Sequence, residues 1–296
     1  MTKPNLFATI LTHAAPSSNY RGESEENRTI IQKITKGGAE HTVVSPESMR
    51  NALREILGSY GLKVNRTRLH DEDQLAVAFA DFPDAAKYAD DFIFGFMVAD
   101  PPAEMKKAKL PAKRDSFLRM NMAVSLVPYR FDATFHQSPL NAGDSKWKNA
   151  TTSALLHREV SFTAYQFPFG LALQEVEGNK DATEWTRRLL DGIGELSNVA
   201  GGHARSYYEM APRSIVARVT PRLVAGWDTY GFDEKGHFAP LSRVNSKDIP
   251  GGEVWVGGEL ARILEGAEKE RLSKEGVHFF DNPQACLKAI AAETLG

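Results

Sequence analysis

The stretch HTVVSPESMRNALREIL (residues 41–57) decides the fold, because a short apolar strand runs directly into a helix whose start is clearly marked. Ser45 can accept a hydrogen bond from backbone N–H groups of the first turn. Pro46 suits the first helical position, and the Glu47 carboxylate complements the positive end of the helix dipole. We therefore expect a helix to begin directly after Ser45.

This helix is predicted to have one buried face and one cationic face. Apolar side chains recur at helical spacing and predict a buried stripe made of Met49, Leu53, Ile56 and Leu57. Arg50 and Arg54 lie four residues apart on a neighbouring face. A helix start with N–H donors beside two arginines can hold a phosphate group. Local features alone favour an ordinary capped helix with solvated arginines, so the phosphate interpretation depends on the rest of the chain.

Length and composition indicate a globular protein with a full hydrophobic core. The chain has 296 residues, of which 42% are hydrophobic and 25% charged, which suits one elaborated domain or two small ones. Its single cysteine, Cys286, excludes an internal disulfide, and the apolar run near residue 10 is too short for a signal peptide. No stretch approaches the length of a membrane span, so we expect a cytoplasmic protein without a membrane partner.

Charge is distributed unevenly along the chain. The formal net charge of -2 argues against a free-standing, non-specific nucleic-acid binder, which usually carries a large positive excess. Residues 101–130 hold four lysines and three arginines against two acids, while residues 228–296 carry twelve acids against eight bases. This segregation fits a protein with one anionic partner along one face and protein neighbours on others.

The order of predicted elements indicates an α+β fold. Strands are expected at residues 5–11, 41–44 and 214–220, and within MAVSLVPYRF (122–131) and HREVSFTAYQFPFGLALQEV (157–176). An amphipathic helix is expected at residues 181–197, with Trp185, Leu189, Ile193 and Leu196 on one face. Strand, helix, two strands, helix, strand is the βαββαβ order of the ferredoxin-like or RRM-like fold. Many functions share that order, so it says little about activity by itself.

The segments between these elements are predicted to be local or irregular. Residues 12–27 form a polar stretch that predicts a long loop, and Lys36-Gly37-Gly38-Ala39 predicts a hairpin turn. Residues 62–117 resemble an insertion that includes a helix-like DQLAVAFADF (73–82). Two more helices are expected at residues 259–272 and 284–294.

Four segments, in this order, resemble the DevR branch of the CRISPR-associated Cascade backbone subunits, a type I-B-like part of the RAMP superfamily. They are VVSPESMRNALREIL (43–57), KRDSFLRMNMAVSLVPY (113–129), HREVSFTAYQFPFGLAL (157–173) and VAGGHARSYYEMAPRSIVARVTPR (199–222). The resemblance runs from about residue 5 to about residue 225. Residues 226–296 match no motif of that family.

The resemblance implies an RRM-like palm with inserted fingers and a β-hairpin thumb, in copies that stack along a guide RNA (crRNA). The implied divisions are palm 1–60, 119–131 and 158–225, fingers 61–118, thumb 132–157, and a C-terminal helical extension 226–296. A subunit repeated along a variable guide cannot depend on base identity, so it would hold sugar and phosphate. Target DNA, further copies of the chain and other Cascade subunits are the remaining implied partners.

The resemblance also assigns roles to particular side chains. Candidate RNA-binding residues are Asn19, Tyr20, Arg21, Ser45, Arg50, Arg54, Lys113, Arg114, His203, Arg205 and Ser206. The thumb would wedge Phe135, Trp147 and Leu155 between bases, and the fingers would line the target-strand channel with Lys106, Lys107 and Lys109. Plain structural interpretations stay open: Gly201-Gly202 as a helix C-cap, residues 19–21 as a surface loop, and the lysines as a solvated face.

The sequence predicts no catalytic centre, no cofactor and no metal site. The acids of HDED (70–73) suit a solvated helix start, and His157 with Glu159 suits one face of a strand. Type III backbone subunits resemble this fold and cut target RNA with an aspartate in the loop after the first strand. That segment here offers only Glu23, Glu25 and Glu26. We expect a non-catalytic subunit, with a metal-dependent RNA endonuclease and a stand-alone RNA-binding regulator as alternatives.

Overall fold

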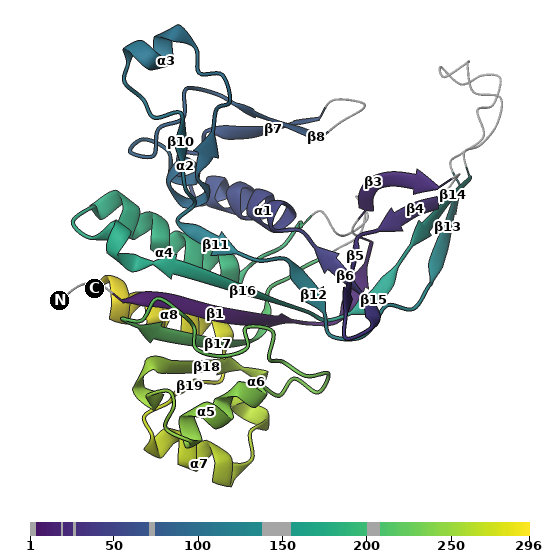
Figure 1. Ribbon diagram of the computed structural model, residues 1–296, viewed down its shortest axis with the longest axis vertical. Coiled ribbons are helices and arrows are strands. Elements are labelled where there is room, and N and C mark those ends of the chain that lie inside the picture. Colours follow the sequence, from purple (N-terminus) through teal and green to yellow (C-terminus); the bar gives the residue numbers. More distant parts are fainter. Residues whose placement is uncertain (1–3, 19, 26–27, 71–74, 138–154, 200–207) are drawn as a thin grey trace.

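A mixed sheet organises the molecule (Figure 1). The computed structural model describes residues 4–18, 20–25, 28–70, 75–137, 155–199 and 208–296. Within these residues the sheet has nine strands, in the order β19-β18-β17-β1-β16-β12-β6-β5, with β11 also paired to β16. Their bounds are β1 Asn5–Thr12, β5 Lys33–Lys36, β6 Ala39–Val44, β11 Leu118–Met120, β12 Ala123–Ser125, β16 Tyr165–Ala172, β17 Pro212–Thr220, β18 Val254–Gly258 and β19 His278–Phe280. The predicted α+β class is confirmed.

The centre of the sheet contains the strands expected from the sequence. β1 lies between β17 and β16, and β12 pairs with the far side of β16, each pair being antiparallel. One face is covered by α1 (Pro46–Ser59), α4 (Lys180–Gly194) and α8 (Pro283–Leu295). Leu6, Ala8 and Ile10 alternate along β1 toward these helices and are buried with them. The period-two pattern of β1 therefore places the main core on the helical side.

The start of α1 is as the sequence predicts. The Ser45 side chain accepts a hydrogen bond from the Ser48 backbone N–H at 3.2 Å, and Pro46 occupies the first helical position. Met49, Leu53 and Leu57 are fully buried. The hairpin turn before this helix is also confirmed, because Gly37 and Gly38 join β5 to β6 with φ of 59° and 81°. Glycine adopts that backbone conformation at little cost.

The C-terminal region, expected as a helical extension, contains helices and also adds two strands to the sheet. VWVGG forms β18 against β17, and β19 follows parallel to β18. A continuous apolar run containing valines suits a strand covered on both faces. A Cβ at Gly257 would lie 2.6 Å from the Cys286 Cβ, so glycine lets α8 pack directly on this strand. The helical parts of this region are η2 Ala239–Leu241, α5 Ser242–Asn245, η3 Gly251–Glu253, α6 Glu259–Ile263, α7 Gly266–Lys274 and α8.

A second sheet projects from one end of the first, as Figure 1 shows, and it corrects the prediction of a loop at residues 12–27. Its order is β13-β14-β4-β3, and β2 pairs separately with β15. The bounds are β2 Ala15–Ser17, β3 Tyr20–Glu25, β4 Arg28–Ile31, β13 Ala133–Gln137, β14 Leu155–Glu159 and β15 Ser161–Thr163. The parallel pairing of β4 with β14 joins segments that are far apart in the chain, so local polarity did not reveal it.

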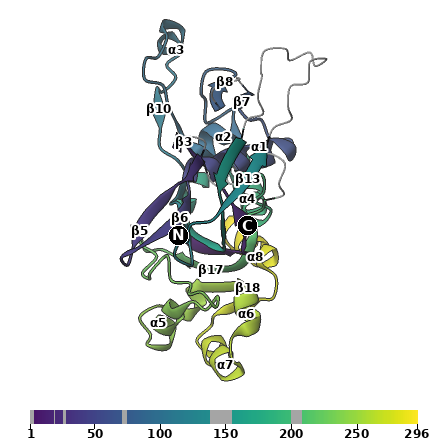
Figure 2. The ribbon, with the colours of Figure 1, turned by 90° about the vertical axis from the view of Figure 1, so that its right-hand side faces the viewer.

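The segment between α1 and β11 forms a separate projection, with α3 at its tip (Figures 1 and 2). Its elements are β7 Arg66–His70, β8 Leu75–Phe79, α2 Ala89–Phe94, β9 Phe96–Met97, α3 Ala103–Lys107 and β10 Lys113–Arg114. The helix-like interpretation of residues 73–82 was wrong, because β8 pairs in antiparallel register with β7. A short apolar run does not distinguish a helix from a paired strand, and here the partner strand decides.

Candidate nucleic-acid interface

Two of the segments predicted to hold RNA start from one buried cluster of hydroxyl groups. The Ser17 Oγ lies 2.6 Å from the Tyr165 hydroxyl, and the Thr42 Oγ1 lies 2.9 Å from the same hydroxyl. Residues 19–21 follow Ser17, and the α1 start at Ser45 follows Thr42. Because all three hydroxyls are buried and hydrogen-bonded, the cluster fixes where these two segments leave the core.

The glycine-rich segment is closed at its base beside this cluster. Asn198 donates its backbone N–H to the Tyr208 carbonyl at 3.1 Å, and Met210 donates to the Leu196 carbonyl at 2.7 Å. Burial raises the pKa of Tyr208, with Tyr165 nearby adding to the rise. The Ser17 side chain opposes this rise in pKa, so the Tyr208 hydroxyl lies next to the Ser17–Tyr165 pair. The described ends of the three predicted RNA-holding segments therefore lie in one region of the central sheet, and His203, Arg205 and Ser206 lie outside the described residues.

The structure describes the Ser45 side chain, but only the backbone of Tyr20 and Arg21 in the segment 19–21. The half-buried Ser45 hydroxyl caps α1 and lies 3.0 Å from the Ser48 hydroxyl, so its oxygen already has partners within the helix start. Tyr20 and Arg21 belong to β3. Asn19 lies outside the described residues, as do the side chains of Tyr20 and Arg21.

Arg54 corrects the prediction of a cationic face on α1. Its Nε donates to the Asp90 Oδ2 at 3.0 Å and its Nη1 donates to the Asn51 Oδ1 at 2.7 Å. The guanidinium also lies 4.9 Å from the centre of the Phe94 ring. Burial lowers the pKa of Arg54, although Asp90 opposes the shift. The Arg54 guanidinium is therefore buried and joins α1 to α2.

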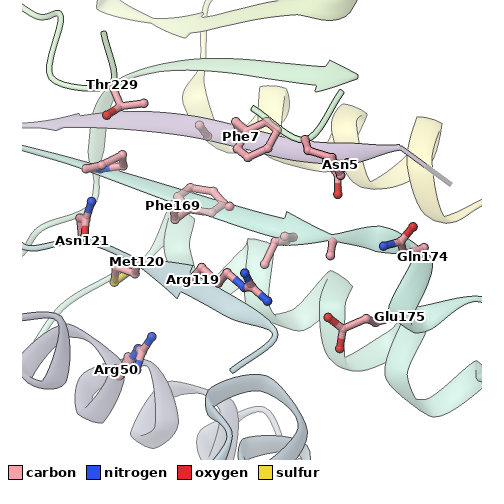
Figure 3. Close-up of a pocket in the computed structure, with 16 residues that line it drawn as sticks. Asn5, Phe7, Arg50, Arg119, Met120, Asn121, Phe169, Gln174, Glu175 and Thr229 are labelled. Carbon is pink, nitrogen blue, oxygen red and sulfur yellow. The ribbon is translucent and has the colours of Figure 1, made fainter. Parts of the chain in front are cut away.

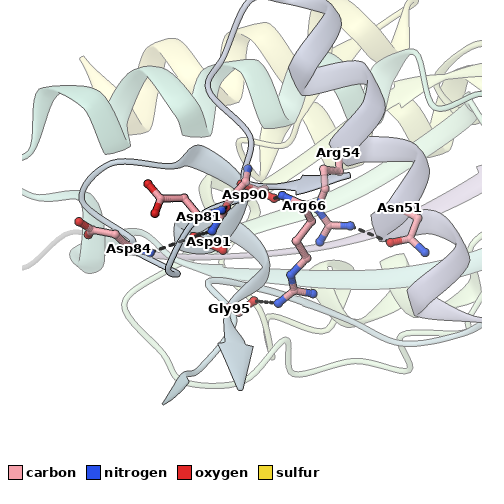
Figure 4. A network of polar contacts seen from close by, with 9 residues as sticks. Asn51, Arg54, Arg66, Asp81, Asp84, Asp90, Asp91 and Gly95 are labelled. Carbon is pink, nitrogen blue, oxygen red and sulfur yellow. Dashed lines mark hydrogen bonds and ion pairs between the residues drawn. The ribbon is translucent and has the colours of Figure 1, made fainter. Parts of the chain in front are cut away.

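The partners of Arg54 belong to a larger network at the base of the fingers (Figure 4). Asp90 also accepts the backbone N–H groups of Asn65 and Arg66, at 2.7 and 3.0 Å. Asp91 accepts the Asn65 side-chain amide at 2.8 Å and the Asp84 N–H at 2.9 Å, both at one oxygen. Two adjacent carboxylates on α2 thus tie α2, β7 and α1 together.

Arg50 lies at the border between the helix and the open side of the sheet. Its Nη2 donates to the Leu118 carbonyl at 3.0 Å, and its side chain is half-buried. Burial lowers the pKa of Arg50, while Glu47 acts in the opposite direction. The Arg50 Nε has no hydrogen-bond partner within the described residues. Because this Nε is itself buried, it is not open to a ligand, and Arg50 can offer only the other nitrogens of its half-buried guanidinium.

The cations of the fingers divide into exposed lysines and one engaged arginine. Lys106, Lys107, Lys109 and Lys113 are exposed on α3, the following turn and β10. Arg114 donates from Nη2 to the Glu175 carboxylate at 3.1 Å and lies 4.8 Å from the centre of the Phe92 ring. The lysines are accessible to a polyanion, whereas Arg114 joins the fingers to η1 (Leu173–Val176).

The thumb presents one of its three predicted wedge residues in the described structure. Phe135 is 55% exposed and packs edge-on against His157, its partner across β13 and β14. Trp147 lies outside the described residues, as does the Leu155 side chain. Glu159 is buried, where it accepts the Ile31 N–H at 3.1 Å, so it ties β14 to β4.

Two exposed aromatic residues near the thumb were missed by the sequence prediction. Phe131 is 63% exposed and Phe162 is 69% exposed. Phe162 pairs with Pro16 across β15 and β2, where it alternates with the buried Ser161 and Thr163. The strict alternation of SFT was the available signal, because the side chains of a strand point to opposite faces.

The described residues contain neither a candidate metal site nor a candidate membrane span. No group of three His, Cys, Asp or Glu side chains is positioned there to hold a metal ion. Asp71, Glu72 and Asp73 of the HDED stretch lie outside this part of the chain. No helix within it is both long and apolar enough to cross a membrane.

Comparison with known proteins gives one close relative by sequence and several by structure. The CRISPR-associated protein Cas7/Cst2/DevR of Myxococcus xanthus (strain DK1622) is 32% identical over 292 residues, which is 93% of each chain. A chain of a CRISPR RNA-guided surveillance complex in a pre-nicking state has a TM-score of 0.63, with 98% of this chain and 100% of that chain covered. A chain of another CRISPR RNA-guided surveillance complex has a TM-score of 0.59, with 98% and 99% covered. Both structures are 13% identical to this chain and show a shared fold, and no family model matches.

Proposed function

This chain belongs to the Cas7/Cst2/DevR family of CRISPR-associated proteins, and on that premise we propose that it is a backbone subunit of a type I CRISPR effector, of the Cascade kind. In this role copies of the chain oligomerise along guide RNA in the cytoplasm, without a membrane partner, beside other Cascade subunits. The assembled copies support pairing of the guide with target DNA. The observation that carries the proposal is the convergence of three candidate RNA-holding segments on the hydroxyl cluster around Tyr165.

The central strands act as an RRM-like palm. Their order, β17-β1-β16-β12, and the helices α1 and α4 on one face are what the βαββαβ connection produces. The guide backbone lies along the α1 start, the segment 19–21 and the segment 203–206. Ser45 shapes the α1 start through its cap, and Arg50 supplies a half-buried guanidinium that is held by the Leu118 carbonyl.

The fingers and the thumb contact the target strand. Exposed lysines on the fingers, Lys106, Lys107 and Lys109, line its channel, and the exposed Lys113 contacts the guide RNA. The thumb places the exposed Phe135 between bases, together with Trp147 and Leu155, and so interrupts the guide–target duplex. Unstacking costs a few kcal/mol per step, which contacts along stacked copies offset. Arg54 and Arg114 hold the fingers on the palm instead of contacting nucleic acid.

The subunit binds and does not cut. A non-catalytic subunit needs side chains only to position nucleic acid and to neutralise its charge. In the segment where type III backbone subunits carry an aspartate, this sequence has glutamates. The corresponding assay is divalent-dependent cleavage of target RNA by the assembled complex. Cleavage that disappears on Glu25→Ala would replace this role with that of an endonuclease.

Binding of two unrelated guide-length RNAs of equal length tests the proposal. Both should bind with the same affinity, and the affinity should fall linearly with salt on a double-logarithmic plot. Arg205→Glu should weaken both by roughly tenfold or more, since hydrogen bonds to charged groups contribute about 1.5–3 kcal/mol. Arg271→Glu, on an exposed face of α7, is the matched control and should leave both unchanged. A loss confined to one RNA sequence would contradict backbone recognition.

A further inference from the structure

The face of the central sheet opposite α1, α4 and α8 is only partly covered. The Thr9 hydroxyl donates to the Thr229 carbonyl at 2.9 Å, and the Gln166 side chain makes two hydrogen bonds to the Phe232 backbone. The Tyr230 hydroxyl donates to the Met122 carbonyl at 2.7 Å. These bonds hold the segment that follows β17 across β1, β16 and β12 of the same chain. The start of the C-terminal region therefore packs on the sheet of its own chain.

A groove of about 660 Å³ remains beside this segment (Figure 3). Its floor is a row across neighbouring strands, because Phe7 of β1 and Arg119 of β11 both face Gly170 of β16 in register. A Cβ at Gly170 would lie 3.3 Å from the Phe7 ring, so glycine leaves this part of the floor flat. The volume lies within the range of small-ligand sites.

The groove contains a cation without a partner. Arg119 is exposed, and within the described part of the chain its guanidinium makes no hydrogen bond or ion pair. Arg50 lines the same groove with a half-buried guanidinium whose Nη2 donates to the Leu118 carbonyl. Glu175, the acid on the rim, is paired with Arg114 at 3.1 Å. The local charge therefore favours an anionic ligand.

The remaining lining suits a planar ring with hydrogen-bonding edges. Phe7 is half-buried, so part of its ring is open to the groove. Asn5, Asn121 and Gln174 bring side-chain amides to the lining, which Figure 3 shows around Phe7 and Arg119. An aromatic ring beside a guanidinium and amides is the set of groups that holds an unstacked base and its phosphate.

We propose that this groove binds one unpaired nucleotide of single-stranded RNA, with the base on Phe7 and Gly170 and the phosphate at Arg119. Its floor is on the sheet face opposite the helices, and Arg50 is the residue that it shares with the segments proposed to hold the guide backbone. The inference rests on the proposed function for the presence of RNA. A peptide segment of a second copy is the competing occupant, and the test separates the two.

The test uses the full chain and a short fluorescein-labelled single-stranded RNA in fluorescence anisotropy. Arg119→Ala and Phe7→Leu should each weaken binding by at least about fivefold, the size expected for one stacked base. Arg271→Ala removes an equal charge from α7 and should bind like the unmodified chain. Urea denaturation of Phe7→Leu establishes that the variant is folded. With 5-iodouridine RNA, cross-links should map to the peptides of β1 or β16 that carry Phe7 and Gly170.

Three results would overturn the proposal, and they have different meanings. Unchanged RNA affinity in both variants, with cross-links only elsewhere, would remove this site and leave the proposed function standing. Unchanged RNA affinity with weaker association between copies would assign the groove to a neighbouring chain. Failure of the unmodified chain to bind any RNA would remove the proposed function, and this site with it.

Discussion

The base of the fingers and the groove on the open palm face both contain arginines, but they use them in opposite ways. At the base of the fingers, Arg54 is buried against Asp90 and Asn51. In the groove, Arg119 is exposed and has no partner within the described residues. The acids supplied by α2 explain the difference, because they arrive from a segment far from α1. Whether a cation is available to nucleic acid is thus decided by distant carboxylates as much as by its own position.

The largest effect should come from breaking the buried pair. Asp90→Ala leaves Arg54 buried without its carboxylate and removes the acceptor for two backbone N–H groups. We expect a loss of about 3–5 kcal/mol in the free energy of unfolding, the usual cost of removing one partner of a buried ion pair. Urea denaturation measures it. A loss below about 1 kcal/mol would show that the fingers are held by other contacts.

The cap of α1 should contribute a smaller amount that can be separated from RNA binding. Ser45→Ala removes the acceptor for the Ser48 N–H and should cost about 1 kcal/mol of unfolding free energy. Ser45→Asp keeps a capping oxygen, so stability should return while the added negative charge weakens RNA binding. If Ser45→Asp bound RNA as well as the unmodified chain, the α1 start would lie away from the guide.

Substitution of the neighbouring Asp91 should raise the free energy of unfolding, whereas substitution of Asp90 should lower it. Burial raises the pKa of Asp91 above its ordinary value of 3.8. A raised pKa means that the folded state binds the Asp91 proton more tightly than the unfolded chain does. The contribution of Asp91 to the free energy of unfolding therefore becomes more favourable as pH falls through its folded pKa toward 3.8. Asp91→Asn keeps an oxygen for the Asn65 amide and the Asp84 N–H without the buried charge. It should raise the denaturation midpoint at neutral pH.

The pH dependence provides the control for this prediction. The advantage of Asp91→Asn over the unmodified chain should shrink as the pH falls below the folded pKa of Asp91. Denaturation midpoints of both proteins across the acidic range measure the difference. An advantage that stayed constant with pH would mean that packing, not charge, separates the two side chains.

The smallest effect should come from the exposed finger lysines. Lys107→Ala should change the unfolding free energy by less than about 0.5 kcal/mol, as expected for a surface position. It should also reduce the slope of log affinity against log salt by about 1 if the lysine contacts a phosphate. Measuring this slope with guide–target duplex in the assembled complex is the direct check. An unchanged slope would leave Lys107 as a solvated residue.

Features that depend on neighbouring residues could be predicted from the sequence, whereas features that depend on residues far away in the chain could not. The Ser45 cap, the buried stripe of α1 and the Gly37-Gly38 turn follow from local spacing and backbone preference. The fate of Arg54 depends on Asp90, which belongs to an insertion of irregular pattern. Strand β3 depends on pairing with β4, and β4 in turn depends on β14 across most of the thumb.

The candidate site shows the same division. The order of its segments along the chain was predictable, because each has its own glycine, proline or cap signal. Their convergence on Tyr165 was not, since Ser17 and Thr42 are ordinary small polar residues until the fold brings them together. Arg119 was also missed, because its importance depends on Gly170 and Phe7 in neighbouring strands.

Native mass spectrometry of the full chain with RNAs of increasing length tests the central claim most directly. A backbone subunit that assembles along guide RNA should add copies in regular steps as the RNA lengthens, with the same copy number on unrelated sequences. One copy per RNA at every length would contradict the account and would indicate a stand-alone RNA-binding regulator.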